Sequence, residues 1–190
     1  LAARYAGDGP GEVVGFGLSN DERMGQTSAF SAAFGIARRA GLAALPHGGE
    51  LLGPESVREV VTSLNPHRLG HGVRTSEDLE LLDRLIEAGI AFEVCPTSNV
   101  HLGVYQDFGS VPLPLLMGRG ATIALGADDP LLFHSRLLEQ YANAREVFAL
   151  SDPQLADLAR QSIEASLASQ SSKRRWYARI EEWVSGEAPV

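Results

Sequence analysis

The 190-residue sequence predicts an α/β fold in which a parallel sheet is followed by helices only. Short apolar runs alternate with segments whose apolar residues recur at helical spacing, which is typical of consecutive βαβ units. Motifs containing histidine, aspartate or glutamate follow or close these runs, and a parallel α/β barrel carries its working residues at the C-terminal ends of its strands. After Asp129 only helical patterns occur. We therefore expect about five strands followed by C-terminal helices.

The predicted elements alternate along the chain. Strands are expected at residues 13–18, 42–45, 68–72, 90–94 and 122–125, and helices between the first four at 27–40, 54–64 and 76–88. Pro54 opens its helix, where the missing N–H costs little, and Gly89 ends the helix before the fourth strand. Residues 95–112 are expected to form a long loop. The final helices are expected at 132–148, 152–168 and 173–184, the second of them opened by a capping-box pattern at Ser151 and Gln154.

Five strands are too few for a closed barrel, which takes eight strands and roughly 250 residues. We expect residues 1–190 to be a single domain, the C-terminal part of a (β/α)8 TIM barrel that lacks its N-terminal strands. The opening segment LAARYAG has no initiator methionine and reads as the end of a helix, so further residues are expected before Leu1.

Composition excludes several classes of partner. The net charge is -8, from 16 basic and 24 acidic residues, whereas nucleic-acid binding needs clustered Lys and Arg. The single cysteine, Cys95, rules out an internal disulfide and is typical of a reducing compartment. No apolar run is long enough to span a bilayer. We expect a cytoplasmic protein that binds neither nucleic acid nor membrane; its oligomeric state is left open.

Four short motifs carry the chemistry of the chain: HGGE at 47–50, RLGHG at 68–72, EVCPTSN at 93–99 and GADDP at 126–130. Neutral imidazoles and carboxylates are ligands that zinc takes in proteins. One histidine and one aspartate from two strand ends would hold a metal, while a second histidine and a glutamate nearby would move protons. The sequence therefore predicts a metal-dependent hydrolytic site.

Together and in this order, the motifs resemble the C-terminal part of the adenosine deaminase family, purine 6-aminohydrolases with a zinc-bearing α/β barrel. The resemblance runs from VVGFGLSNDE onward. It implies that His47 and Asp128 are zinc ligands, that Asp128 also touches the attacking water, and that Glu50 protonates purine N1. It further implies that His71 orients or deprotonates that water, that Asp129 contacts purine N7, and that the backbone N–H of Asn20 meets purine N3.

The chain also departs from the family pattern. The family takes two further zinc ligands from an H-x-H pair on its first strand, and no H-x-H occurs in this sequence. Catalytic zinc usually has at least three protein ligands, so the other two are expected from the missing N-terminal part. HGGE and GADDP replace the more usual HAGE and NTDDP, and Asn20 stands where the adenosine enzymes commonly have glycine. These differences leave the identity of the purine open.

The expected function is zinc-dependent hydrolysis of adenosine or deoxyadenosine to inosine or deoxyinosine and ammonia, with the purine nucleoside as the small-molecule partner. Adenine and aminofutalosine are alternative substrates. A non-catalytic fragment that needs a complementing chain, and a different metal-dependent amidohydrolase, are alternative functions. Two local alternatives also stay open: Glu50 capping the helix that follows it, and Asp129 bonding the backbone of the turn before Pro130.

Overall fold

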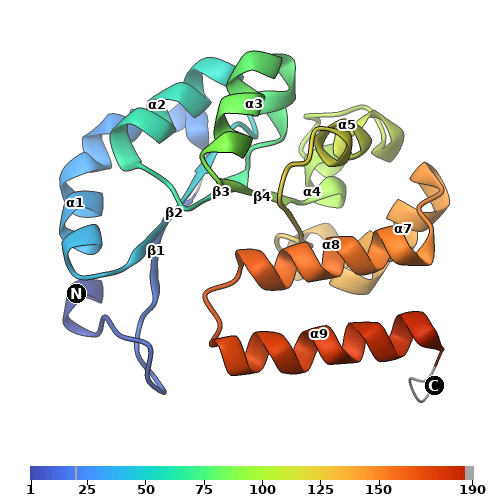
Figure 1. Ribbon diagram of the computed structural model, residues 1–190. Coiled ribbons are helices and arrows are strands. Elements are labelled where there is room, and N and C mark those ends of the chain that lie inside the picture. Colours follow the sequence, from blue (N-terminus) through green and yellow to red (C-terminus); the bar gives the residue numbers. More distant parts are fainter. Residues whose placement is uncertain (20, 187–190) are drawn as a thin grey trace. The chain divides into compact units, whose positions relative to one another are not determined.

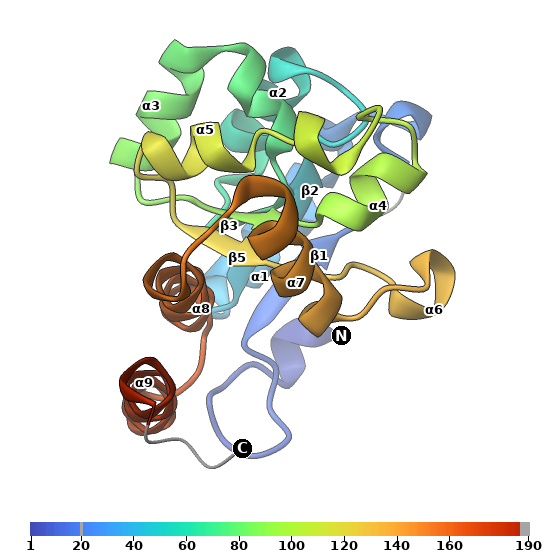
Figure 2. The same ribbon diagram turned by 90° about the vertical axis from the view of Figure 1, so that its right-hand side faces the viewer.

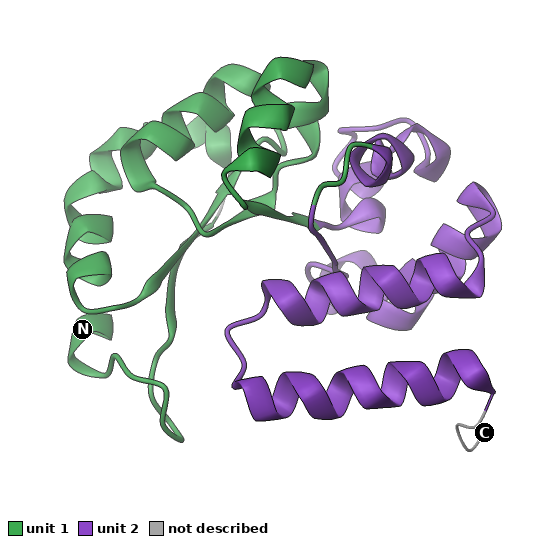
Figure 3. Cartoon of the chain, in the orientation of Figure 1, with its two compact units in different colours: residues 1–93, 119–121 green, residues 94–118, 122–190 purple. Residues whose placement is uncertain are grey.

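The computed structural model describes residues 1–19 and 21–186 (Figure 1). The chain divides into two compact units (Figure 3). Unit 1 contains residues 1–93 and 119–121, and unit 2 contains residues 94–118 and 122–190. His47, Glu50 and His71 belong to unit 1, whereas Asp128 and Asp129 belong to unit 2.

The strands occur in the sheet in the same order as in the chain, β1-β2-β3-β4-β5. Each of the first three pairs in parallel with its successor, as expected for βαβ units. Val94 at the end of β4 accepts a hydrogen bond from the N–H of Gly126, which directly follows β5 (2.8 Å). The strands are β1 (Gly15–Leu18), β2 (Ala43–Gly48), β3 (Arg68–His71), β4 (Ala91–Val94) and β5 (Ile123–Leu125).

In unit 1 the connections between strands are helical, and α1 and α2 lie against one face of the strands (Figure 1). Phe34 of α1 is fully buried and packs edge-to-face on Phe16 of β1, with ring centroids 4.9 Å apart. Ala44 and Leu64 complete this cluster. The helices are η1 (Ala2–Arg4), η2 (Glu22–Met24), η3 (Thr27–Phe30), α1 (Ser31–Arg39), α2 (Pro54–Leu64), η4 (Val73–Glu77) and α3 (Leu79–Glu87).

In unit 2, α8 packs on β5 and also bonds its backbone: Gln161 accepts the N–H of Ile123 (2.8 Å) and Ser162 that of Leu125 (3.2 Å). Helices α8 and α9 run side by side (Figure 2). The helices are α4 (Pro96–His101), η5 (Phe108–Ser110), α5 (Leu113–Gly118), α6 (Pro130–Phe133), α7 (Leu137–Phe148), α8 (Asp152–Ala165) and α9 (Gln170–Ser185). Over residues 1–19 and 21–186, every helix is too short or too polar to cross a membrane.

Two predicted elements were wrong. The segment expected to be a long loop contains α4 and η5, and Pro96 stands in the first turn of α4. That proline is a helix-start signal which the surrounding turn formers obscured. The single helix expected at 132–148 is broken, because His134 adopts a left-handed backbone (φ 50°) that ends α6 before α7 begins. Leucines on both sides of the break continue the apolar pattern across it.

Candidate active site

His47 lies near the C-terminal end of β2, opposite Gly70 of β3. The imidazole lies so close to Gly70 that a Cβ added there would be 2.7 Å from His47 Nδ1. This nitrogen is buried and has no hydrogen-bond partner among the described residues. A buried polar atom without a partner costs about 1–3 kcal/mol. The absence of a side chain at Gly70 thus leaves room for the His47 ring. Among the described residues, no group bonds to Nδ1 of His47, so this nitrogen could accept a hydrogen bond or bind a metal.

His71 and Glu50 form a buried pair beside His47. The distance from His71 Nδ1 to Glu50 Oε1 is 3.3 Å, and the two side chains are only 3% and 8% exposed. The rings of His71 and His47 meet edge-to-face with centroids 5.0 Å apart. Three of the predicted site residues are therefore brought together within unit 1. A buried carboxyl group next to an imidazole is suited to passing a proton.

The backbone at this cluster adopts conformations that favour glycine. Gly49 has φ 75° and Gly72 has φ 69°, but His71 also lies in the left-handed region, with φ 63°. Two hydrogen bonds join the β2 and β3 loops, from Gly72 N to Gly48 O (3.0 Å) and from Arg74 N to Gly49 O (2.9 Å). Strained non-glycine residues persist where the surroundings fix them, and they are frequent at functional sites.

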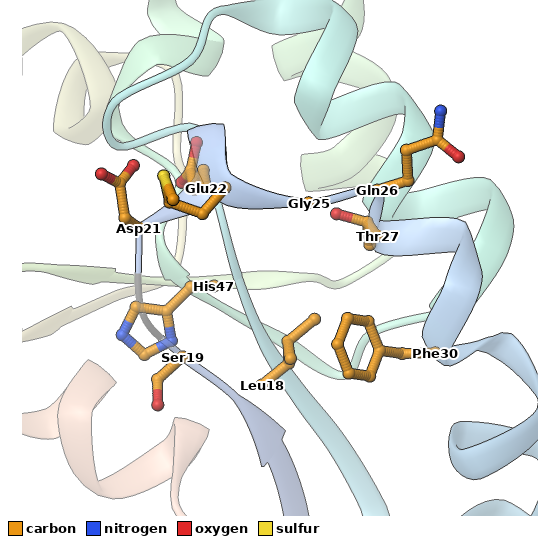
Figure 4. Close-up of a pocket in the computed structure, with 10 residues that line it drawn as sticks. Leu18, Ser19, Asp21, Glu22, Gly25, Gln26, Thr27, Phe30 and His47 are labelled. Carbon is orange, nitrogen blue, oxygen red and sulfur yellow. The ribbon is translucent and has the colours of Figure 1, made fainter.

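A cavity of about 230 Å³ lies beside His47 and is lined only by residues of unit 1 (Figure 4). Sites for drug-sized ligands are larger, about 300–1,000 Å³, so this cavity suits a small molecule or one part of a larger one. Its wall has both apolar and polar side chains. They include Leu18, Met24 and Phe30 among the apolar ones, and Ser19, Gln26 and Thr27 among the polar ones.

Asp21, which lines this cavity, forms an ion pair with Arg23. Its carboxylate accepts hydrogen bonds from the side chain of Arg23, at 2.8 Å from both Nε and Nη2, and from the backbone N–H of Arg23 at 3.0 Å. These interactions lower the pKa of Asp21 from 3.8 to about 2. Asp21 therefore stays ionised at every pH at which an enzyme is normally assayed.

Glu22 is a candidate residue that the sequence did not single out. Its Oε1 accepts the backbone N–H of Glu50 at 2.8 Å, and its Oε2 accepts that of Leu52 at 3.0 Å. The only sequence signal was its place in LSNDE, next to the predicted substrate loop. The structure also bears on one local alternative: the N-cap residue of α2 is Gly53, so Glu50 does not occupy the N-cap position of that helix.

The remaining predicted residues are not all described. Asp128, three residues after the end of β5, is exposed and has φ 57°. Asp129 Oδ1 accepts the N–H groups of Leu131 and Leu132, both at 3.1 Å, and so caps α6. Bonding to the backbone of the turn is one of the two roles that the sequence left open for Asp129. Contact between its other carboxylate oxygen and a purine stays a prediction. Asn20 lies outside the described residues.

Comparison with known proteins gives one consistent result. A family model described as adenosine deaminase matches residues 1–183. The putative adenosine/adenine deaminase of Streptomyces virginiae is 53% identical over 98% of this chain and 54% of its own length. The crystal structure of an adenine deaminase from Arthrobacter aurescens matches with a TM-score of 0.88 and 30% identity, over 92% of this chain and 53% of that one.

An amidohydrolase from Burkholderia ambifaria with bound zinc matches with a TM-score of 0.83 and 25% identity, over 93% of this chain and 50% of that one. The chain thus spans about half the length of the relatives it matches. This confirms the predicted fold class, the C-terminal part of a (β/α)8 barrel. The ordered motifs, the fold and the match over residues 1–183 establish that the chain belongs to the adenosine deaminase family.

Proposed function

We propose that the full-length protein containing this chain hydrolyses the 6-amino group of a purine, releasing ammonia and the 6-oxopurine. The observation that supports this most directly is the buried pair of Glu50 and His71 beside His47, in a member of the adenosine deaminase family. Adenine is our first candidate substrate, ahead of the adenosine and deoxyadenosine that the motifs suggested. The structural neighbour from Arthrobacter aurescens is described as an adenine deaminase, and the Streptomyces relative's name includes adenine.

Zinc is the proposed cofactor, held by His47 and Asp128 with two further histidines from outside this chain. The residues fit, because an imidazole and a carboxylate are normal zinc ligands and His47 makes no hydrogen bond through Nδ1 within the described residues. The structural neighbour with bound zinc supports the same metal. When bound, zinc would make water acidic enough to act as the nucleophile near neutral pH.

Side chains of residues 1–190 would then donate and accept the protons of the reaction. Carbon C6 of the purine becomes electrophilic when ring nitrogen N1 is protonated, and we assign that proton to the carboxyl group of Glu50. His71 accepts a proton from the attacking water, and its 3.3 Å contact with Glu50 keeps both groups in reach of one another. Asp128 orients the water, and Asp129 and the backbone N–H of Asn20 contact purine N7 and N3. His71 then returns its proton to the 6-amino group, the C6–N bond breaks to release ammonia, and the proton of the new C6 hydroxyl group restores the Glu50 carboxyl group.

The test compares turnover of adenine, adenosine, deoxyadenosine and aminofutalosine by the full-length, zinc-loaded protein. Turnover is measured as the release of ammonia. We expect one of these purines, adenine first, to be deaminated well above the others. Equal inactivity on all four with zinc bound would refute the proposal.

We also propose that residues 1–190 alone turn over no purine, because they provide two zinc ligands where at least three are needed. Mixing them with a polypeptide that holds the first-strand histidines tests whether activity can be restored by a second chain. A cytoplasmic location is proposed from the single, buried Cys95.

A further inference from the structure

Both carboxylate oxygens of Glu22 bond to the backbone of the loop that carries Glu50. Oε1 accepts from Glu50 N at 2.8 Å and Oε2 from Leu52 N at 3.0 Å, across 28 and 30 residues of sequence. Hydrogen bonds to an ionised carboxylate are roughly twice as strong as neutral ones. The side-chain cap of η2 is provided by Asp21 and not by Glu22.

The same loop is held from the other side by Arg74. Its Nη1 donates to the carbonyl oxygen of Leu51 at 2.7 Å, so consecutive residues 50, 51 and 52 each have a backbone group bonded to a charged side chain. Glu22 lies after β1 and Arg74 after β3, on either side of β2 in the sheet. The loop between β2 and α2 is therefore bonded to the segments that follow both neighbouring strands.

We infer that Glu22 is a positioning residue for the deamination proposed above, and that it acts by fixing the backbone of Glu50. With the N–H of residue 50 held, the Glu50 carboxyl group stays at its 3.3 Å contact with His71. Glu22 also lines the cavity beside His47, but both of its carboxylate oxygens are bonded to this loop, so we assign its effect to the loop and not to the reacting atoms. This inference rests on the proposed function.

The test is steady-state kinetics of Glu22→Gln in the full-length protein. The amide keeps the size of the side chain but presents an NH2 group to one of the two N–H donors, so one hydrogen bond becomes a repulsion. Misplacement of a catalytic group by about 1 Å can cost about 100-fold. We expect kcat to fall about 10- to 100-fold while KM changes little, because a proton donor acts mainly in the transition state.

The matched control is Glu12→Gln. Glu12 Oε2 likewise accepts a backbone N–H, that of Gly9 at 2.7 Å, but in an exposed turn before β1. We expect its kcat to equal that of the unchanged protein. A second readout is amide hydrogen exchange, which should accelerate at Glu50 and Leu52 in the Glu22 variant and not at Val60 in α2.

The possible results separate cleanly. A lower kcat with unchanged KM and faster exchange at Glu50 supports the inference. An unchanged kcat overturns it, and so does a loss of activity that follows only a general loss of stability. If the unchanged protein deaminates no purine, the proposed function fails and the catalytic part of the inference fails with it, whereas the exchange rates still report whether Glu22 holds the loop.

Discussion

Replacing Gly70 by alanine tests whether His47 is a metal ligand, because Gly70 makes the space for its ring. A Cβ at this position would lie 2.7 Å from Nδ1, 2.9 Å from Cγ and 3.0 Å from Cε1 of His47. Real Cβ atoms essentially never lie closer than 3.0 Å to such atoms, and ordinary van der Waals contact begins at 3.4 Å, so the ring must move by up to about 0.7 Å. Functional constellations tolerate displacements of about 0.5 Å. The ring cannot stay where it is.

We expect Gly70→Ala to weaken zinc binding by the full-length protein about 10- to 100-fold, the size of effect seen when groups supporting a metal ligand are changed. The affinity is measured by competition with a chromophoric chelator. Overpacking should also lower the free energy of unfolding by about 1–3 kcal/mol, which is measured by unfolding the protein in urea. The affinity must therefore be measured at a temperature where circular dichroism shows the variant to be folded.

Gly118→Ala is the matched control. Gly118 ends α5, and a Cβ there meets nothing within 4 Å. Its zinc affinity should equal that of the unchanged protein. The reasoning is wrong if folded Gly70→Ala binds zinc as tightly as before, because then either the ring did not need to move or His47 does not hold the metal.

Three further changes test the remaining assignments. Glu50→Gln should lower kcat about 100- to 10,000-fold, as expected for loss of a general acid, with unchanged zinc content measured by atomic emission; intact purine turnover would instead favour a different metal-dependent amidohydrolase. His71→Asn should lower kcat about 100-fold or more and keep more thermal stability than His71→Ala, because asparagine tolerates the left-handed backbone at φ 63°. Arg23→Ala should return the pKa of Asp21 from about 2 towards 3.8, as measured by NMR titration. Because folding lowers this pKa, the Asp21–Arg23 pair stabilises the unchanged protein above about pH 4, and this stabilisation is lost as the pH falls towards 2.

The sequence predicted most of the fold because local signals and the overall topology agree. Alternation of apolar runs and helical patterns located four of the five strands to within two residues and the end of β2 to within three, and Pro54 opens α2 as expected. The errors come from segments where two signals compete: Pro96 starts a helix among turn formers, and the left-handed His134 interrupts an apolar pattern that continues on both sides.

The candidate site was predictable only where a motif carries a reactive side chain. His47, Glu50 and His71 were predicted and lie together. Glu22 was not, because its role depends on hydrogen bonds to a loop about thirty residues away, and nothing in its neighbourhood in the sequence specifies that contact. Residues that hold a site are harder to predict than residues that react.

The glycine at position 48 shows why departures from a family motif must be judged in three dimensions. HGGE has Gly48 where the more usual motif has alanine, which at first puts the substrate in doubt. A Cβ on Gly48 would lie 2.8 Å from Cγ2 of Val60, a fully buried residue of α2, so a branched side chain already fills the space that the alanine methyl would need. This departure is explained by packing against α2 and says nothing about the purine. We propose that the choice of purine depends instead on the side chains that line the cavity beside His47, where Ser19, Gln26 and Thr27 are the uncharged polar groups among the described residues.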